Sequence, residues 1–333
     1  MSAEQTGTAA AAPVFAVQEP TEKESRMPME IRMEGKTERK IDPRAVLFLG
    51  VLGASVSALL VRASRAPSLV TATGRLALTV LLLLPSLLLR HRAELRAATR
   101  RDLLFCALSG MCLALHFTAW FESLKWTSIA SSTVLVSTEV IFTALGFTLF
   151  LKGKIPRLGA AAIALAFGGS VVLAISDGGA GGGALKGDLL AVAAAVFVAL
   201  YTLIGQVQRA RQSTTVYTFL TYAACLATLL VLDGATGTSL RGWGIREALV
   251  CLGLAVFCTL LGHSLFSWSL KFFSPAYVSA VKLCEPVFAS ALGLLLFREA
   301  IRPLQALGGA VVLGAVLLYT KVEAVSGGPP ECS

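Results

Sequence analysis

The chain has 333 residues, of which 55% are hydrophobic and only 15% are charged, and its mean hydropathy is +0.74. Soluble domains are about half apolar and about a quarter charged, so this composition excludes an ordinary soluble protein. The formal net charge is +9, but most of the basic residues flank apolar runs, where cytoplasmic loops of membrane proteins concentrate them. The charge therefore indicates membrane topology and no nucleic-acid partner.

Ten apolar runs lie between two polar ends. Residues 1–43 predict a disordered cytoplasmic tail, and residues 322–333 predict a disordered C-terminal tail. Each run can cross a hydrocarbon core of about 30 Å as a helix, and none alternates strictly as a barrel strand would. The sequence predicts an all-α integral membrane protein with ten transmembrane helices near 44–61, 67–89, 103–123, 129–151, 157–176, 187–208, 214–232, 247–270, 275–297 and 303–320.

A few polar or aromatic residues stand out in the first five spans. Arg75 lies well inside the second span, from where it either reaches back to the interface or lines a cavity. His116, in the third span, fits a hydrogen-bonded core histidine or a proton relay. Trp120 fits an aromatic wall for a solute or an interface anchor, and we favour the anchor. Glu139, in the fourth span, has Val136 three residues earlier and so no charged partner on its own helix.

A Gly-rich stretch, 177–186, separates two groups of five spans. It lacks the GK[ST] ending of a phosphate-binding loop, so a linker is favoured. The predicted organisation is a first five-helix repeat at 44–176, this linker, and a second five-helix repeat at 187–321.

The second group of spans carries similar residues. His263 lies in the eighth span and invites the same two interpretations as the first histidine. Trp268 and Tyr277 fit aromatic walls or interface anchors. Lys282 and Glu285 lie three positions apart in the ninth span, so on one helix they share a face and can neutralise each other.

An internal repeat relates the two groups. Shifting the chain by 146 residues lays 122–155 over 268–301 without a gap, and Glu139 then meets Glu285. An acid at the same depth of two apolar spans is hard to obtain by chance, so we interpret the match as a duplication. Because each half has an odd number of spans, the two halves are predicted to be inverted relative to each other.

The buried charges allow two interpretations. A carboxylate or ammonium at a helix centre costs about 2.5–3.5 kcal/mol on insertion, so it needs a partner or a wet cavity. In the structural interpretation, Lys282 and Glu285 form a pair that sets helix register and Glu139 is protonated in a packed seam. In the functional interpretation, all three line a central cavity that binds a zwitterionic or ionic solute.

These residues also carry a family resemblance. The segment LCEPVFASALGLLLFREAI, 283–301, and the preceding SLKFFSPAYVSAV, 269–281, are similar to the EamA-like family of the drug/metabolite transporter superfamily. The resemblance implies a ten-helix inverted-repeat fold, cytoplasmic termini, a central cavity and movement of small metabolites, often outward. The chain departs from the usual family pattern at Val140, where proline is common, at Gly153, where the second half has glutamate, and at Cys284.

The predicted function is a secondary transporter of the cell membrane that moves a small amino-acid-like or other polar or ionic metabolite, as an exporter, by alternating access. Its partners are the solute, the lipid bilayer and, if transport is coupled, protons. No cofactor or metal is expected, and the cysteines fit buried apolar thiols. The alternatives are a membrane-embedded enzyme and a channel or scaffold. We expect no enzyme, because paired aspartates, a HExxH face or a serine elbow are missing from the sequence.

Overall fold

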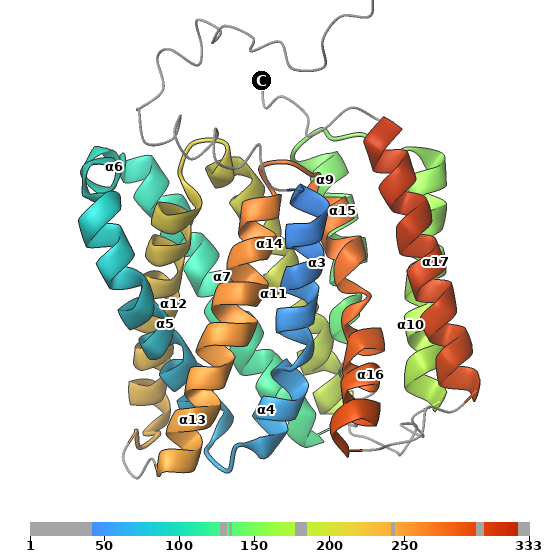
Figure 1. Ribbon diagram of the computed structural model, residues 1–333. Helices are drawn as coiled ribbons and strands as arrows, with labels where there is room; N and C mark the ends of the chain where they lie inside the picture. The colour runs from blue at the N-terminus through green and yellow to red at the C-terminus, as the bar shows by residue number, and fades with distance from the viewer. Residues whose placement is uncertain are drawn as a thin grey trace, which may run out of the picture.

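A computed structural model describes residues 42–126, 132, 135–176, 185–240, 244–297 and 303–325. These residues form a bundle of helices that run side by side, and they include no strand (Figure 1). The predicted tail 1–43, the linker 177–186 and the tail 322–333 lie largely outside the described residues.

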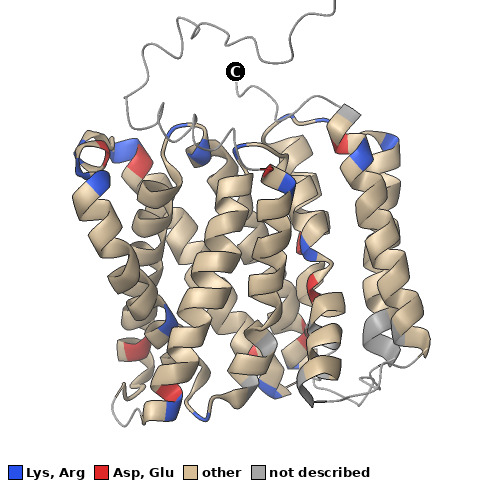
Figure 2. Cartoon of the chain, viewed as in Figure 1, with Lys and Arg blue, Asp and Glu red and all other residues tan. Residues whose placement is uncertain are grey.

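Within the part of the chain that the structure describes, seven helical segments are long and apolar enough to cross a membrane, so the chain is an integral membrane protein. Large apolar side chains such as Leu89, Val231 and Leu295 are at least 70% exposed on the bundle, as expected for a surface that faces lipid. Charged residues gather toward the ends of the helices (Figure 2). The expectation of ten spans goes beyond these seven and stays a prediction. The seven are Pro43–Val61, Ser68–Arg90, Arg100–Trp126, Leu185–Arg209, Thr214–Thr236, Ile245–Ser269 and Ala306–Ala324.

The described part of the first half contains both long and short helices. The first predicted span is divided at Val56, and the segment from Leu135 to Leu149 is a shorter apolar helix that includes a turn at Thr138. The elements are α3 (Pro43–Ser55), α4 (Ser57–Ala63), α5 (Ser68–Arg90), α6 (Arg92–Ala97), α7 (Arg100–Trp126), α9 (Glu139–Leu149) and α10 (Arg157–Ser176).

The second half is built in a similar way, with two composite segments. The eighth predicted span consists of α13, a π-helix and α14 in direct succession, and the ninth is divided into α15 and α16. The elements are α11 (Leu185–Arg209), α12 (Thr214–Thr236), α13 (Ile245–Gly253), the π-helix η1 (Leu254–His263), α14 (Ser264–Ser269), α15 (Pro275–Lys282), α16 (Glu285–Phe297) and α17 (Pro303–Val325).

Helix starts follow local sequence signals. The side chain of Ser213 accepts a hydrogen bond from the backbone N–H of Val216 and so caps α12. Ser274 caps α15 in the same way, and Pro275 follows at the first helical position, where the missing N–H costs nothing. Asp42 does the same for α3.

The ninth span breaks in front of Glu285, which corrects the expectation of one continuous helix. α15 ends at Lys282, and the next two residues close tight turns through backbone bonds from Leu283 to Ala280 and from Cys284 to Val281. Pro286 lies in the first turn of α16, where proline is tolerated, but its ring and missing N–H prevent a regular helix from running through this point.

The fourth span breaks at the equivalent place by another means. Thr138 is a turn residue directly before Glu139, and its hydroxyl donates to the carbonyl of Leu135 at 2.6 Å. A side chain that bonds the backbone in this way competes with the regular helical ladder. Both duplicated acids therefore begin a new helix, although only the second copy has a proline.

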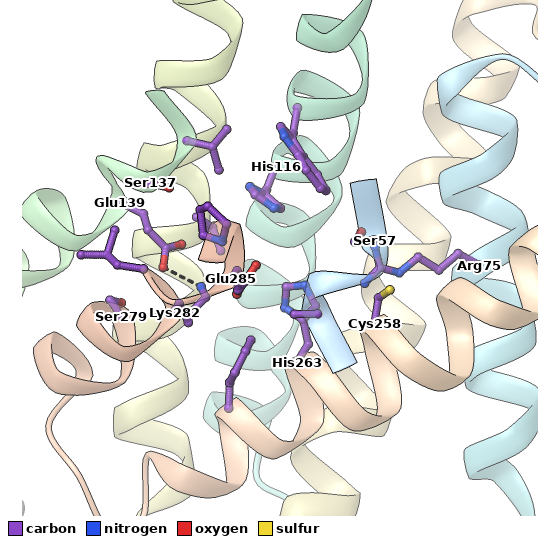
Figure 3. Close-up of a pocket in the computed structure, with 17 residues that line it drawn as sticks. Ser57, Arg75, His116, Ser137, Glu139, Cys258, His263, Ser279, Lys282 and Glu285 are labelled. Carbon is purple, nitrogen blue, oxygen red and sulfur yellow. Dashed lines mark hydrogen bonds and ion pairs between the residues drawn. The ribbon is translucent and has the colours of Figure 1, made fainter. Parts of the chain in front are cut away.

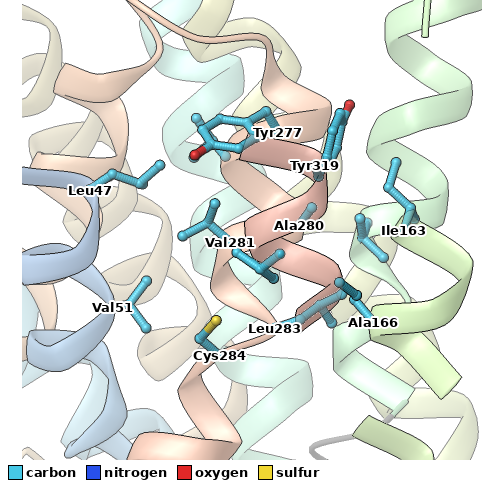
Figure 4. Close-up of a cluster of buried hydrophobic side chains, with 14 of the residues drawn as sticks. Leu47, Val51, Ile163, Ala166, Tyr277, Ala280, Val281, Leu283, Cys284 and Tyr319 are labelled. Carbon is cyan, nitrogen blue, oxygen red and sulfur yellow. The ribbon is translucent and has the colours of Figure 1, made fainter. Parts of the chain in front are cut away.

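The two largest apolar clusters among the described residues each join several helices. One joins α3, α10, α15 and α17 around residues such as Val281 and Tyr319 (Figure 4). The other joins α5, α7, α11 and α12 around residues such as Phe117 and Tyr222. The α10–α17 contact depends on glycine, because a Cβ added to Gly169 would lie 3.0 Å from the carbonyl oxygen of Gly308.

Candidate functional site

A cavity of about 90 Å³ lies inside the bundle and is lined by residues from both halves of the chain. Seven of the nine residues singled out from the sequence line it (Figure 3). They include side chains of both charge signs, two imidazoles and one indole. These residues are Arg75, His116, Trp120, Glu139, His263, Lys282 and Glu285.

An ion pair between the two halves forms one wall of the cavity. The Nζ atom of Lys282, at the end of α15, lies 2.6 Å from Oε1 of Glu139, at the start of α9. Both side chains are largely buried, with 13% and 6% of their surfaces exposed. The lysine therefore pairs with the acid of the other half and not with Glu285, because the helix break between Lys282 and Glu285 removes the shared face expected of one continuous helix.

Glu285 also lines the cavity, but it has no comparable partner. Within the described part of the chain, its carboxylate makes no hydrogen bond or ion pair. The repeat supplies the reason. Position 282 in the second half corresponds to position 136 in the first, and there the cavity is lined by Val136, which cannot donate a hydrogen bond to the acid.

Arg75 points into the cavity from α5 (Figure 3) and is only 1% exposed, so it does not reach back to the interface. Its Nε donates to Oγ1 of Thr259 on η1 at 2.6 Å. Its guanidinium carbon lies 4.2 Å from the centre of the Phe117 ring, a cation–π contact. Its Nη1 and Nη2 atoms are buried and have no hydrogen-bond partner among the described residues.

The two histidines meet at the cavity, with ring centres 6.5 Å apart. Nδ1 of His116 lies 2.9 Å from the carbonyl oxygen of Ala194, and because a carbonyl only accepts, this nitrogen carries a proton. His263 is one position out of register with His116 in the repeat. It is the last residue of the π-helix η1.

The aromatic residues separate into two groups. Trp120 lines the cavity and stacks on His116 with ring centres 6.0 Å apart. Trp268 and Tyr277 are not among the residues that line it, and their interpretation as interface anchors stays a prediction. Trp268 packs on Phe272, and the Tyr277 hydroxyl is 2.8 Å from that of Thr320 because this face of α15 turns toward α17.

Smaller polar residues were missed from the sequence. Thr259 positions the guanidinium of Arg75, and Ser57, Cys258 and Ser279 also line the cavity. Helical spacing could have indicated Ser279, which precedes Lys282 by three positions, but the others reach the cavity only through packing. Among the described residues, no group of three His, Cys, Asp or Glu side chains could hold a metal ion. What the arrangement can do is bind a small solute that carries opposite charges.

Comparisons with known proteins agree on one family. The sequence profile of the EamA-like transporter family matches residues 40–175 and 185–321. The chain is 24% identical over 247 residues to an uncharacterized transporter of Clostridium kluyveri, covering 72% of this chain and 79% of the relative. It is also 24% identical over 220 residues to an uncharacterized transporter of Archaeoglobus fulgidus, covering 64% and 74%. A solved crystal structure has the same fold, with a TM-score of 0.70 at 18% identity over 85% of this chain and 98% of that one.

Proposed function

The chain belongs to the EamA-like transporter family, and we propose that it is a secondary transporter that moves a small amino-acid-like or other polar or ionic metabolite across the cell membrane. It works by alternating access, in which the two halves rock around the central cavity and expose it to one side at a time.

The observation that carries this proposal is the composition of the cavity wall. Charged side chains of both signs reach one small cavity from both halves of the chain, and the pair between Glu139 and Lys282 joins the halves directly. Buried charges are costly in a membrane and usually mark a solute or ion path. A solute that bears charged groups can offset that cost by binding there.

The proposed architecture is two inverted repeats of five spans, 44–176 and 187–321. The packing supports it, because two pairs of corresponding helices from the two halves contact each other: α5 with α12 and α10 with α17. The directions of the helices support it as well. In Figure 1, α3 begins at the upper end of the bundle, whereas α11, its equivalent in the second half, begins at the lower end.

We assign both termini to the cytoplasm and the direction of transport to export. The assignment of the termini rests on the basic loop that includes α6 and on the basic loop between α9 and α10, which would both face the cytoplasm. The size of the cavity supports a small solute. At about 90 Å³ it is smaller than the roughly 150 Å³ cavity that holds benzene, so a larger solute requires the helices to move apart.

The test is flux through the purified protein in liposomes. Radiolabelled amino acids and related small metabolites are screened for saturable uptake and for counterflow against an unlabelled pool. A carrier gives both, whereas a channel gives flux without counterflow and an enzyme gives no flux. Uptake that does not change with an imposed pH gradient would exclude proton coupling. An exporter moves its solute into inside-out membrane vesicles, so a failure of such vesicles to take up the solute would contradict export.

A matched pair of variants ties the flux to the cavity. Glu285→Gln removes the unpartnered carboxylate and is expected to reduce flux by at least about tenfold. Glu122→Gln makes the same chemical change at the end of α7, where the side chain is 36% exposed and pairs with Lys125 at 2.8 Å. Flux should remain near that of the wild type in the second variant. Equal flux in both variants would separate transport from this cavity.

A further inference from the structure

Arg75 is a buried cation whose hydrogen-bonding capacity is only partly used. Thr259 receives its Nε–H, Phe117 covers one face of its guanidinium, and the side chain lines the cavity. Nη1 and Nη2 are left without hydrogen-bond partners among the described residues. A buried charged donor without an acceptor costs several kcal/mol, so an acceptor of opposite charge is expected at this site.

Glu285, elsewhere on the cavity wall, is an acid that lacks a cationic partner among the described residues. Its carboxylate has no ion-pair partner in the described chain, and Val136 stands where the repeat would place a lysine. Lys282 is already engaged by Glu139 at 2.6 Å. The cavity therefore presents one open cation and one open anion, while the other two charges satisfy each other.

The charge balance selects the class of ligand. With both acids ionised, the four charged side chains of the cavity are two cations and two anions, and their sum is zero. A solute with a single charge would leave one uncompensated charge in the bilayer interior, which is costly. A zwitterion brings one charge for each open group and leaves the sum at zero.

We infer that the cavity binds its solute as a zwitterion with a defined orientation, in which the carboxylate is held by Nη1 and Nη2 of Arg75 and the ammonium group by Glu285. The planar fork of a guanidinium matches a carboxylate with two parallel hydrogen bonds, and Thr259 fixes the fork by taking the Nε–H. Glu139 and Lys282 form a structural ion pair in the wall of the site and do not bind the solute. This assignment rests on the proposed transport function and adds to it the ligand class and its two subsites.

The test is equilibrium binding, which is independent of flux. The probes are two matched sets: alanine, ethylamine and propionate, and leucine, isopentylamine and 4-methylpentanoate. Each is titrated against the purified full-length protein, and binding is recorded as a shift in the thermal unfolding midpoint. In the wild type, a zwitterion should bind at least about tenfold more tightly than its amine or its carboxylate, because only the zwitterion satisfies both open groups.

Charge-selective variants distinguish recognition from a structural role. Arg75→Met should move the preference toward the amine of the set, and Glu285→Gln should move it toward the carboxylate. Arg75→Lys keeps the charge but loses the fork, so it should weaken zwitterion binding by about tenfold without changing the order of preference. This third variant keeps the test decisive if Arg75→Met does not fold.

The inference is overturned if none of the six probes binds, if an amine or carboxylate binds the wild type as tightly as its zwitterion, or if Arg75→Lys binds like the wild type. Failure of the proposed function looks different. Zwitterion binding without saturable flux would contradict transport and leave the subsites in place, whereas flux without preference for zwitterions would contradict the subsites alone.

Discussion

The two copies of the duplicated helix share an acid but differ in what surrounds it. Glu139 begins α9 and is paired with Lys282 across the two halves. Glu285 begins α16 at the corresponding position, but Val136 occupies the place from which a lysine would reach it. The two carboxylates therefore stand at matching positions of the repeat, and the residue three positions earlier differs, valine in the first half and lysine in the second.

This difference teaches that symmetry in the sequence does not imply symmetry of role. A carboxylate held by a lysine at 2.6 Å is a structural contact with little capacity for another ligand. Glu285 has no ion-pair partner among the described residues, and in the proposed mechanism it binds the solute. We therefore expect the first acid to matter most for stability and the second most for transport.

The largest effect is expected from breaking the paired side. Lys282→Met leaves Glu139 buried without its cation, and this should lower the free energy of unfolding by about 3–5 kcal/mol. Denaturant titration of the purified protein in micelles measures the change. The double variant Lys282→Met with Glu139→Gln should recover most of the loss, because it leaves no unpaired charge. A double variant as unstable as the single one would show that the loss does not come from an unpaired Glu139.

The next largest effect is expected from a substitution that gives Glu285 the same surroundings as Glu139. Val136→Lys places a lysine where it can pair with Glu285, as Lys282 pairs with Glu139. Because the carboxylate would then be engaged, flux should fall by about tenfold, equivalent to about 1.4 kcal/mol. Counterflow in liposomes measures it. Val136→Met, which adds length without charge, is the control and should keep more of the flux. Equal loss in both variants would indicate a steric effect.

A smaller effect concerns how each copy breaks its helix. Thr138→Val removes the hydroxyl that donates to Leu135, so α9 loses the side-chain bond that accompanies its start. A net loss of about 1 kcal/mol in unfolding free energy is expected, the usual contribution of one hydrogen bond. Thr148→Val, a similar change on an exposed part of α9, serves as the control and should cost less. Equal losses would assign no special role to the break.

The smallest effect is expected from the exposed pair at the end of α7. Lys125→Met breaks its contact with Glu122, whose oxygen lies 2.8 Å away, but the lysine is 50% exposed. The unfolding free energy should change by less than about 1 kcal/mol, because solvent already screens the pair. The same denaturant titration measures it, and a loss as large as that of Lys282→Met would mean that burial is not what separates the two pairs.

Several features of the fold followed from the sequence alone. The long apolar runs predicted a helical integral membrane protein, and the segment from 283 to 301 predicted membership of the EamA-like family, which is confirmed. The roles of the cavity residues stay predictions. Hydrophobicity and sequence motifs are local properties that do not depend on tertiary packing. They can therefore be recognised without knowing which residues lie nearby in the folded protein.

Other features could not be predicted in this way. Trp268 and Tyr277 resemble Trp120 in the sequence, yet only Trp120 lines the cavity. The orientation of each side chain depends on helix rotation, and a rotation of one residue, about 100°, moves a side chain to another face. His263 was one position out of register with His116, and the π-helix that it ends has no clear signal in the sequence.

The sequence by itself determined that two acids lie at matching positions of two apolar segments, because the shift of 146 residues that aligns these segments needs no knowledge of the packing. Only the tertiary structure decided that Lys282 forms an ion pair with Glu139. It also decided that the Nη atoms of Arg75 lie beside the cavity without a hydrogen-bond partner among the described residues. Ion pairs form between atoms a few ångströms apart, and residues 143 positions apart come that close only when the helices have packed.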